Sequence, residues 1–598
     1  MRSEFTHDDS ILILHLAADG KKVYIFTSIV LCPAKPVFEL QPSDTFYKHT
    51  IHLIILYTSS KNICMSELNR RHFLKQSALL ASGVAGSGLI NMPAFAAGTF
   101  QGESPVAATT CGQVRGYTDD GIRVFKGVRY GSDTSARRFM APLPPEKWTG
   151  ITDATKYGPS SPQQSRDEEM TSEDCLFLNV FTPALRDQKK RPVMFYIHGG
   201  AYANGSGSSP LYDGVRLCKR GDVVVVSVNH RLNAFGYLYL SRFGGEQFSD
   251  SGNAGQLDLI LALKWVRENI AEFGGDPGKV LVFGQSGGGA KIATMMAMPA
   301  AKALFHRAAT MSGQQVTASG PLNATQRTRA ILDALGLSPE RVEEIRTMPF
   351  QKIVEVLNTK DPVLPFGGVS FAPVLDERWL KRHPFYPDAP SQSSNIPMII
   401  GNTHDETRAF LGNDPSNFTV TWEQLPEKLI PNLRVDIQPE LVIAEYRKLY
   451  PRLSPSDLLF KITTASRSWR GAIIEVEERA KSGFPAYAYQ LDWATPGDGG
   501  KFGAPHASDI QLVFDNIGKP GATAIGPGAQ PMADMMSESF ITFARTGNPN
   551  NKLIPNWQHY TLPRRQTMVF DVPAHLEDDP RGGERRIFEK VPFVQAGT

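Results

Sequence analysis

The segment at residues 279–290 constrains the fold more than any other part of the chain. Its apolar, β-branched run at residues 280–283 predicts a buried strand. The chain then passes through Gly-Gln-Ser-Gly-Gly at residues 284–288 into residues that favour a helix, which we expect to end at Pro299. Glycines on both sides of a serine permit a sharp strand-to-helix turn that exposes the hydroxyl. The pattern therefore predicts an α/β protein in which Ser286 is a nucleophile.

A phosphate-binding loop is the nearest alternative for this glycine-rich turn, because Gly284 and Gly289 have the separation that such loops use. That motif requires lysine directly after the second glycine, followed by serine or threonine. Here Ala290 follows the glycine, and Ile292 follows Lys291. The sequence therefore excludes a phosphate loop at this position.

Size and composition fit a large protein with a substantial core. The 598 residues, 41% of them hydrophobic, suffice for a substantial core, and a net charge of +3 gives no reason to expect a nucleic-acid partner. No pair of cysteines has zinc-ligand spacing, so we expect neither a metal nor a disulfide framework. The five cysteines are Cys32, Cys64, Cys111, Cys175 and Cys218.

The N-terminal region differs from the rest of the chain. Its apolar patches are interrupted, and none reaches the roughly 18 residues that a membrane span needs. Residues 65–97 begin with Met65, continue through Arg70-Arg71-His72-Phe73-Leu74-Lys75 and an uncharged run, and reach Ala-Phe-Ala at residues 94–96. A basic start, an apolar middle and small residues at the end predict a secretory signal. The paired arginines resemble a bacterial twin-arginine signal.

A signal of this kind belongs at the start of a chain. We therefore predict that Met65 is the initiator, that residues 1–64 are disordered upstream sequence, and that residues 98–598 form the exported domain. The alternative is a genuine but disordered N-terminal extension. Export through this signal would place the mature protein in a bacterial periplasm or outside the cell.

From about residue 106 to residue 590 the chain resembles the type-B carboxylesterases, the family that includes the cholinesterases. Glu-Asp-Cys-Leu-Phe-Leu-Asn-Val at residues 173–180 matches one family signature, and residues 283–289 match the other. This resemblance implies an α/β-hydrolase fold, with a central, mostly parallel sheet flanked by helices. It also implies insertions, at roughly residues 322–388 and 423–451, that cap the site above Ser286.

The resemblance also assigns the partners of Ser286. In α/β-hydrolases the acid and then the histidine follow the serine along the chain. Glu406 matches the catalytic acid, with Asp405 as the alternative, and His506 matches the catalytic histidine. The acid is expected to orient the imidazole and stabilise its protonated form.

Backbone amides complete the predicted site. A glycine turn follows the predicted strand at residues 193–197, and by resemblance Gly200, Ala201 and Gly287 supply an oxyanion hole. Ser312 and Asp509 match groups that brace the catalytic histidine. The family's buried ion pairs correspond to Arg138 with Glu173 and Arg231 with Asp258.

Two departures from the family pattern are informative. Ser161 replaces a cysteine that commonly pairs with the one in the first signature, so Cys175 is expected to be a free buried thiol. Thr407 replaces a glycine beside the predicted acid.

Together these residues predict a serine hydrolase that cleaves small carboxylic esters through an acyl-enzyme, with a Ser-His-Glu triad and without a cofactor or metal. An amidase, a carbamate hydrolase or a thioesterase would use the same residues. A non-catalytic adhesion module related to the cholinesterases is a further alternative.

Overall fold

The computed structural model describes residues 10–19, 22–31, 50–54, 104–164, 170–364, 367–595 and 597. Within the first 64 residues, β1 (Ser10–Asp19), β2 (Lys22–Leu31) and β3 (Thr50–Ile54) form an antiparallel sheet in the order β2-β1-β3. Most of residues 1–64 lie outside the described residues, so the predicted disorder of that segment stays a prediction. The origin of residues 1–64 stays a prediction, and the predicted signal at residues 65–97 lies outside the described residues.

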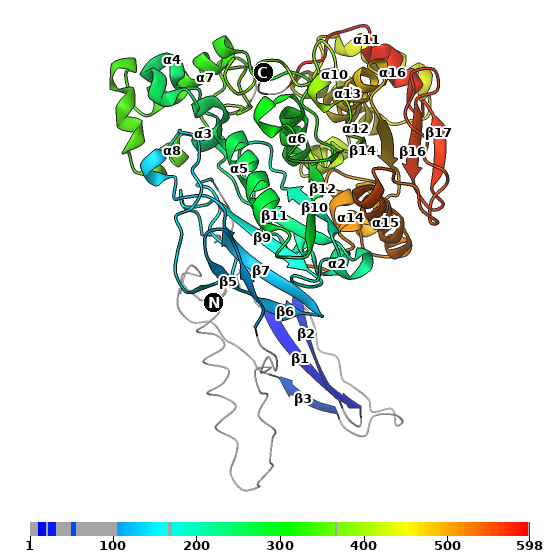
Figure 1. Ribbon diagram of the computed structural model, residues 1–598. Helices are drawn as coiled ribbons and strands as arrows, with labels where there is room; N and C mark the ends of the chain where they lie inside the picture. Colours follow the sequence, from blue (N-terminus) through cyan, green and yellow to red (C-terminus); the bar gives the residue numbers. More distant parts are fainter. Residues whose placement is uncertain are drawn as a thin grey trace, which may run out of the picture. The chain divides into compact units, whose positions relative to one another are not determined.

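An eleven-stranded sheet organises the described part of residues 104–597 (Figure 1). Its seven strands from β16 to β11 run parallel, and antiparallel strands complete both edges. In sheet order the strands are β17 (His575–Asp578), β16 (Gln566–Phe570), β15 (Ala486–Leu491), β14 (Met398–Thr403), β13 (Arg307–Met311), β12 (Gly275–Gln285), β10 (Arg191–Ile197), β11 (Val224–Val228), β9 (Phe177–Thr182), β7 (Ile122–Arg129) and β6 (Tyr117–Asp119). A small sheet contains β4 (Val106–Ala108), β5 (Gln113–Arg115) and β8 (Ile151–Asp153).

Helices cover both faces of the large sheet, as expected for a parallel sheet with apolar strands. Along β12, Val280 and Val282 pack into one core cluster, whereas Leu281 and Phe283 pack into another, because successive side chains point to opposite faces. One face is covered by α5 (Ala254–Asn269), α6 (Gly287–Ala297) and α13 (Arg470–Lys481), and the other by α2 (Val215–Gly221), α14 (Ser508–Val513) and α15 (Ala529–Thr546). The predicted fold class is thus confirmed.

Two further helical groups include the predicted cap insertions, and the second group extends beyond residues 423–451. One contains α7 (Pro321–Ala334) and α8 (Phe350–Glu355) with the 3₁₀ helix η6 (Pro339–Arg346). The other contains α10 (Leu425–Leu429), α11 (Pro439–Leu449) and α12 (Pro455–Thr464) with α16 (Gly582–Phe588). Each group has its own small hydrophobic core, and Figure 1 shows the two groups on opposite sides of the upper part of the domain. The remaining short helices are α3 (Asn233–Tyr237), α4 (Ser241–Gly244) and α9 (Arg408–Leu411).

Both expected ion pairs form, and each joins two separate segments of the chain. Arg231 donates two hydrogen bonds to the carboxylate of Asp258, of 2.9 and 2.6 Å, and all four side-chain atoms involved are buried. Arg138 pairs with Glu173 through an Nε–Oε1 hydrogen bond of 2.6 Å. Cys175 is a free, fully buried thiol, as predicted.

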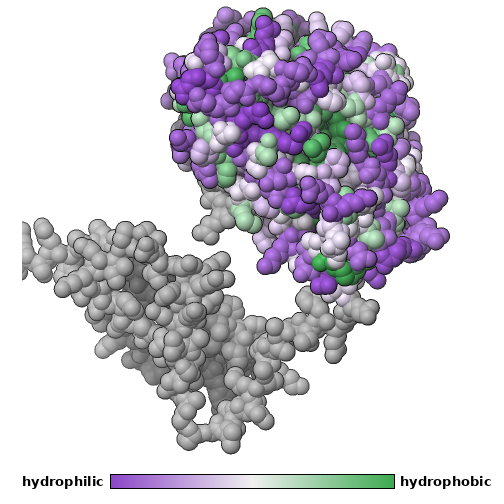
Figure 2. Space-filling model, turned by 60° about the vertical axis from the view of Figure 1, so that its left-hand side comes forward, coloured by the Kyte–Doolittle hydropathy of each residue, from purple (hydrophilic) through white to green (hydrophobic). Residues whose placement is uncertain are grey.

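In the face shown by Figure 2, hydrophilic residues predominate and hydrophobic residues occur in small groups. Among the described residues, none of the helices combines the length and the apolar character that crossing a bilayer requires.

Candidate active site

Ser286 lies at the turn between β12 and α6, in the strained conformation that the sequence predicts. Its φ and ψ are 55° and −127°, a region that residues with side chains rarely occupy. A Cβ on Gly288 would overlap the carbonyl oxygen of Ile197, and one on Gly284 would lie 2.7 Å from the same oxygen. Glycine is therefore required on both sides, because the turn presses against β10.

The serine opens into a cavity of about 240 Å³ at the carboxyl edge of the sheet. Loops that follow β10, β12, β13 and β15 contribute Ala201, Ser286, Ser312 and His506 to its wall. Carboxyl ends of parallel strands meet at one edge, which is where α/β proteins place their ligands. The cap insertions contribute Phe371 and its neighbours, and the C-terminal residues 593–595 close another side.

His506 and Glu406 form a hydrogen-bonded pair within this edge. The Nδ1 atom of His506 contacts the Oε2 atom of Glu406, whose carboxylate is completely buried. The carboxylate also accepts from the backbone N–H of Thr403 at 3.0 Å and from the amide of Asn402 at 3.3 Å. Burial alone would raise the pKa of Glu406, but His506, the hydroxyl of Ser312 and the N–H of Thr403 hold it below its usual value. The carboxylate is thereby kept ionised beside the imidazole.

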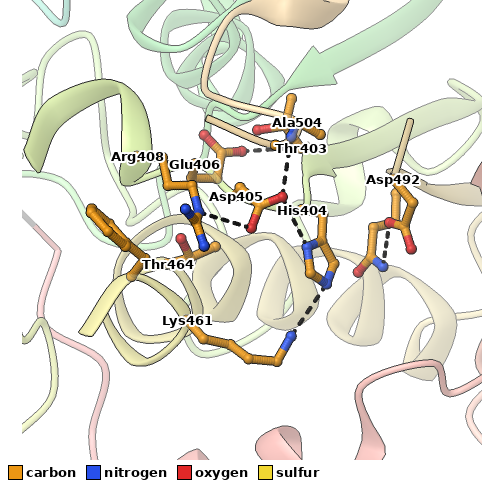
Figure 3. A network of polar contacts seen from close by, with 12 residues as sticks. Thr403, His404, Asp405, Glu406, Arg408, Lys461, Thr464, Asp492 and Ala504 are labelled. Carbon is orange, nitrogen blue, oxygen red and sulfur yellow. Dashed lines mark hydrogen bonds and ion pairs between the residues drawn. The ribbon is translucent and has the colours of Figure 1, made fainter. Parts of the chain in front are cut away.

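Asp405, the alternative acid, belongs to a different network (Figure 3). Its carboxylate accepts from the N–H of Ala504 at 3.1 Å and contacts His404 and Arg408 at 3.2 and 3.5 Å. Figure 3 shows Asp405 pointing toward these groups, whereas Glu406 points toward Thr403. Of these two neighbouring acids, Glu406 is the one that hydrogen-bonds His506.

The Nε2 atom of His506 lies 3.0 Å from the side-chain amide nitrogen of Gln285. Because Nδ1 faces a carboxylate, the hydrogen-bond network assigns the proton to Nδ1 and leaves Nε2 as an acceptor. Among the described residues, Nε2 accepts from Gln285 and forms no hydrogen bond with Ser286. Phe410 packs against the imidazole at a ring-centre distance of 4.8 Å.

The predicted oxyanion-hole residues lie beside the serine. Gly200 and Ala201 have φ values of +86° and +51°, and their N–H groups donate to no other group among the described residues. Gly287 is the first residue of α6, so its N–H has no acceptor within the helix. A Cβ on Gly287 would overlap the carbonyl of Ala201, so the two loops are in direct contact.

Comparison with known proteins decides the family. The model of the carboxylesterase family matches residues 103–585. The chain belongs to the carboxylesterase family. Para-nitrobenzyl esterase of Bacillus subtilis is 34% identical over 502 residues, which span 80% of this chain and 98% of that protein. Phenmedipham hydrolase of Pseudarthrobacter oxydans is 31% identical over 502 residues, which span 80% of this chain and 96% of that protein.

Solved structures agree with this assignment. A crystal structure of a Geobacillus stearothermophilus carboxylesterase has a TM-score of 0.72 and 37% identity, and the match covers 81% of this chain and 99% of that one. A para-nitrobenzyl esterase structure has a TM-score of 0.69 and 35% identity, over 80% and 99% of the two chains. This carboxylesterase chain is therefore a carboxylic ester hydrolase with the α/β-hydrolase fold.

Among the described residues, no hydrogen bond joins Ser312 or Asp509 to His506. Ser312 lines the cavity. Asp509 is buried and accepts from the hydroxyl of Tyr489 at 2.8 Å, and burial raises its pKa to about 6. Their role in bracing the histidine stays a prediction.

Lys291 is a buried group that the sequence analysis used only to exclude a phosphate loop. It lies on α6, is completely buried, and donates from Nζ to the carbonyl oxygen of Ala201 at 2.7 Å. Burial lowers its pKa to about 7, and no carboxylate pairs with it among the described residues. In the sequence, the lysine among apolar helix residues was the signal that could have singled out this position. Only the fold brings its ammonium group to the carbonyl of Ala201.

Proposed function

We propose that this carboxylesterase cleaves its substrate through an acyl-enzyme, with Ser286 as nucleophile, His506 as general base and Glu406 as the acid that orients the imidazole. One observation carries the proposal. His506 directs Nδ1 at the buried carboxylate of Glu406, and its ring lines the same cavity as Ser286. This is the arrangement that activates a serine in hydrolases of unrelated folds.

Attack begins when Nε2 of His506 removes the proton from the Ser286 hydroxyl. In the free protein the amide of Gln285 donates a hydrogen bond to Nε2 of His506. The Gln285 side chain therefore has to move away before Nε2 can accept the proton of Ser286. The oxyanion that forms accepts hydrogen bonds from the N–H groups of Gly200, Ala201 and Gly287, each contributing about a hundredfold or more in rate. His506 then protonates the leaving alcohol, and a water molecule releases the acid by the reverse sequence.

Covalent labelling and kinetics test this proposal together. An organophosphonate should label the wild-type protein at Ser286, and p-nitrophenyl acetate should give hydrolysis that S286A loses by about a millionfold in kcat. Matched melting temperatures would show that the variant is folded. Esterase activity that survives in S286A would remove the serine from the mechanism, and absence of labelling would favour the non-catalytic adhesion module.

The same residues could cleave amides, carbamates or thioesters, which remain the alternatives within hydrolases. The similar proteins are named as esterases and hydrolases, which favours the ester. Parallel assays with an acetyl anilide, an aryl carbamate and a thioester matched to p-nitrophenyl acetate would rank these substrates by kcat/KM. If the ester does not have the highest kcat/KM, the assignment of the protein as an esterase changes.

We also propose that residues 65–97 direct export through a twin-arginine signal and are removed from the mature protein. Mass spectrometry of the protein from its native host should find an N-terminus near Ala96 or Ala97. Replacing Arg70 and Arg71 by lysine should retain the protein inside the cell. Abundant peptides from residues 1–64 would contradict initiation at Met65.

A further inference from the structure

Two arginines share the cavity with the reacting groups. Arg434 comes from the second cap insertion, and Arg467 comes from a π-helical turn, Ala465–Trp469, between α12 and α13. A π-helical turn inserts an extra residue into the helix and changes the direction of its side chains, and such turns are frequent at functional sites. Both arginines line the same cavity as Ser286 and His506.

Neither guanidinium group has an acidic partner among the described residues. Arg467 makes no side-chain hydrogen bond there, and its guanidinium carbon lies 4.3 Å from the ring centre of Phe410. Arg434 makes only long contacts, from Nη1 to backbone carbonyls at 3.3 and 3.4 Å, and its Nε is buried without a partner. Several other buried arginines do have acidic partners, as in Arg231 with Asp258 and Arg327 with Asp361.

The two positive charges lie close enough to affect one another. Burial and the neighbouring charge of Arg434 together lower the pKa of Arg467 to about 10, against the opposing effect of Glu406. Burial also lowers the pKa of Arg434. Both groups remain protonated at neutral pH, so the cavity wall holds two unpaired cations. An unpaired, partly desolvated charge is costly, and an anion that binds between the two guanidinium groups reduces that cost.

Arg467 also lies near the proposed reacting groups. Phe410 contacts the imidazole of His506 at 4.8 Å and the guanidinium of Arg467 at 4.3 Å. The guanidinium carbon is therefore no farther from the centre of the imidazole than these two distances together. A substrate that spans this distance carries its carboxylate a few carbon–carbon bonds from the scissile carbonyl.

We propose that Arg434 and Arg467 form a carboxylate-binding subsite, and that the preferred substrates are esters carrying a free carboxylate a few bonds from the scissile carbonyl. This assignment rests on the proposed function, since it names a substrate class for the same site. Guanidinium groups bind carboxylates through paired, charge-assisted hydrogen bonds, which gives orientation as well as affinity. The subsite would hold the ester so that its carbonyl faces Ser286 and the backbone amides.

A purely electrostatic role for Arg467 is the main competing explanation. Its charge lies close enough to interact with Glu406 and would support the ionised carboxylate whatever the substrate is. That role would change the hydrolysis of all esters by the same factor. The ratio of kcat/KM for a carboxylate-bearing ester to that for its neutral counterpart therefore separates the two explanations.

The test uses two matched pairs of esters on the full-length protein. The mono-p-nitrophenyl ester of glutaric acid is compared with p-nitrophenyl pentanoate, which places the carboxylate on the acyl side. In the second pair, 4-acetoxybenzoate is compared with methyl 4-acetoxybenzoate. The carboxylate of 4-acetoxybenzoate lies on the alcohol side of the acetate ester. In at least one pair we expect wild type to favour the anionic ester by about tenfold or more in kcat/KM, a preference that salt weakens.

Arg434→Gln and Arg467→Gln should each reduce kcat/KM for the favoured anionic ester by roughly tenfold to a hundredfold, and change the neutral ester by less than about threefold. Arg470→Gln is the matched control. Arg470 is also half-buried, with guanidinium nitrogens that lack partners, but it does not line the cavity. Its replacement should leave the ratio between the two esters unchanged.

The outcomes are distinguishable. If the neutral esters are hydrolysed in a reaction that depends on Ser286, but neither pair shows a preference for the anion, the subsite is wrong and the proposed function stands. If the arginine variants lower both members of a pair equally, the arginines support Glu406 and bind no carboxylate. If no ester is hydrolysed, the proposed function and the subsite both fail.

Discussion

The two sides of the cavity differ in how the chain satisfies their polar groups. On the sheet side, Glu406 accepts hydrogen bonds from His506, Thr403 and Asn402, and the strained turn at Ser286 is locked by backbone contacts. On the cap side, Arg434 and Arg467 face the same space without acidic partners among the described residues. The buried acid on the sheet side therefore has its hydrogen-bond donors within the chain, whereas the two arginines on the cap side have no acidic partner in the described part of the chain.

Under the proposed function, this difference separates chemistry from selectivity. The groups proposed to transfer protons have to keep one geometry, and they lie on loops fixed by parallel strands. Groups on inserted segments make fewer contacts with the chain and so retain donors for a ligand. Lys291 lies between the two cases, because it is buried on the sheet side but donates only to the carbonyl of Ala201 among the described residues.

Among the variants that test this comparison, the largest effect is expected from Glu406→Gln, which leaves the shape of the sheet side intact and removes its negative charge. We expect kcat to fall by about a thousandfold to ten-thousandfold, because the imidazole loses its orientation and its stabilised protonated form. Asp405→Asn is the matched control and should change kcat by less than about tenfold. Steady-state hydrolysis of p-nitrophenyl acetate measures both, and the opposite ranking would make Asp405 the acid.

Lys291→Met tests the intermediate case. The thioether side chain fills similar space but cannot donate to the carbonyl of Ala201, whose φ of +51° is strained for alanine. We expect kcat to fall by roughly tenfold to a hundredfold while KM changes little, because the loss concerns stabilisation of the oxyanion. An unchanged kcat would mean that Ala201 keeps its conformation without the lysine.

The same variant should be more stable than wild type, by an amount that depends on pH. Burial lowers the folded-state pKa of Lys291 to about 7, so the unfolded chain binds more protons than the folded one between about pH 7 and the usual lysine pKa. Wild-type stability therefore rises with pH across this window, and the advantage of Lys291→Met should shrink. Burial also lowers the pKa of the nearby His198 and His230, which keeps them neutral there.

Thermal or urea unfolding at pH 6.5 and pH 10 measures this difference. We expect a gain of about 1–4 kcal/mol at the lower pH, in the range found when buried charges are replaced by apolar groups of similar volume. A loss of stability at pH 6.5 would show that the hydrogen bond to Ala201 outweighs the cost of burying the ammonium group.

The smallest effect is expected from Gln285→Met. The amide of Gln285 occupies Nε2 of His506, so its removal frees this atom for the serine hydroxyl. We expect kcat/KM to rise by roughly fivefold, which corresponds to the net free energy of one hydrogen bond. A decrease would instead assign Gln285 a positioning role for the imidazole ring.

Much of the site could be predicted from local sequence. The turn at Ser286 follows from the glycines on both sides, since no other residue fits against the backbone of β10. The buried run before it predicts a central strand, and the family signatures predict the parallel sheet, the cap insertions and both buried ion pairs. The choice of Glu406 over Asp405 rested on resemblance, because adjacent acids on a loop differ only in the direction they point.

The sequence by itself determined the strand-turn-helix that exposes a serine, because that pattern depends on neighbouring residues and backbone sterics. Only the tertiary structure decided which buried charges have partners. Lys291, Arg434 and Arg467 are unremarkable in the sequence, since a charge is paired or unpaired according to side chains that come from distant segments. The turn at Ser286 was therefore predictable from local pattern, and the unpaired charges of the cavity became visible only when the cap and the sheet were brought together.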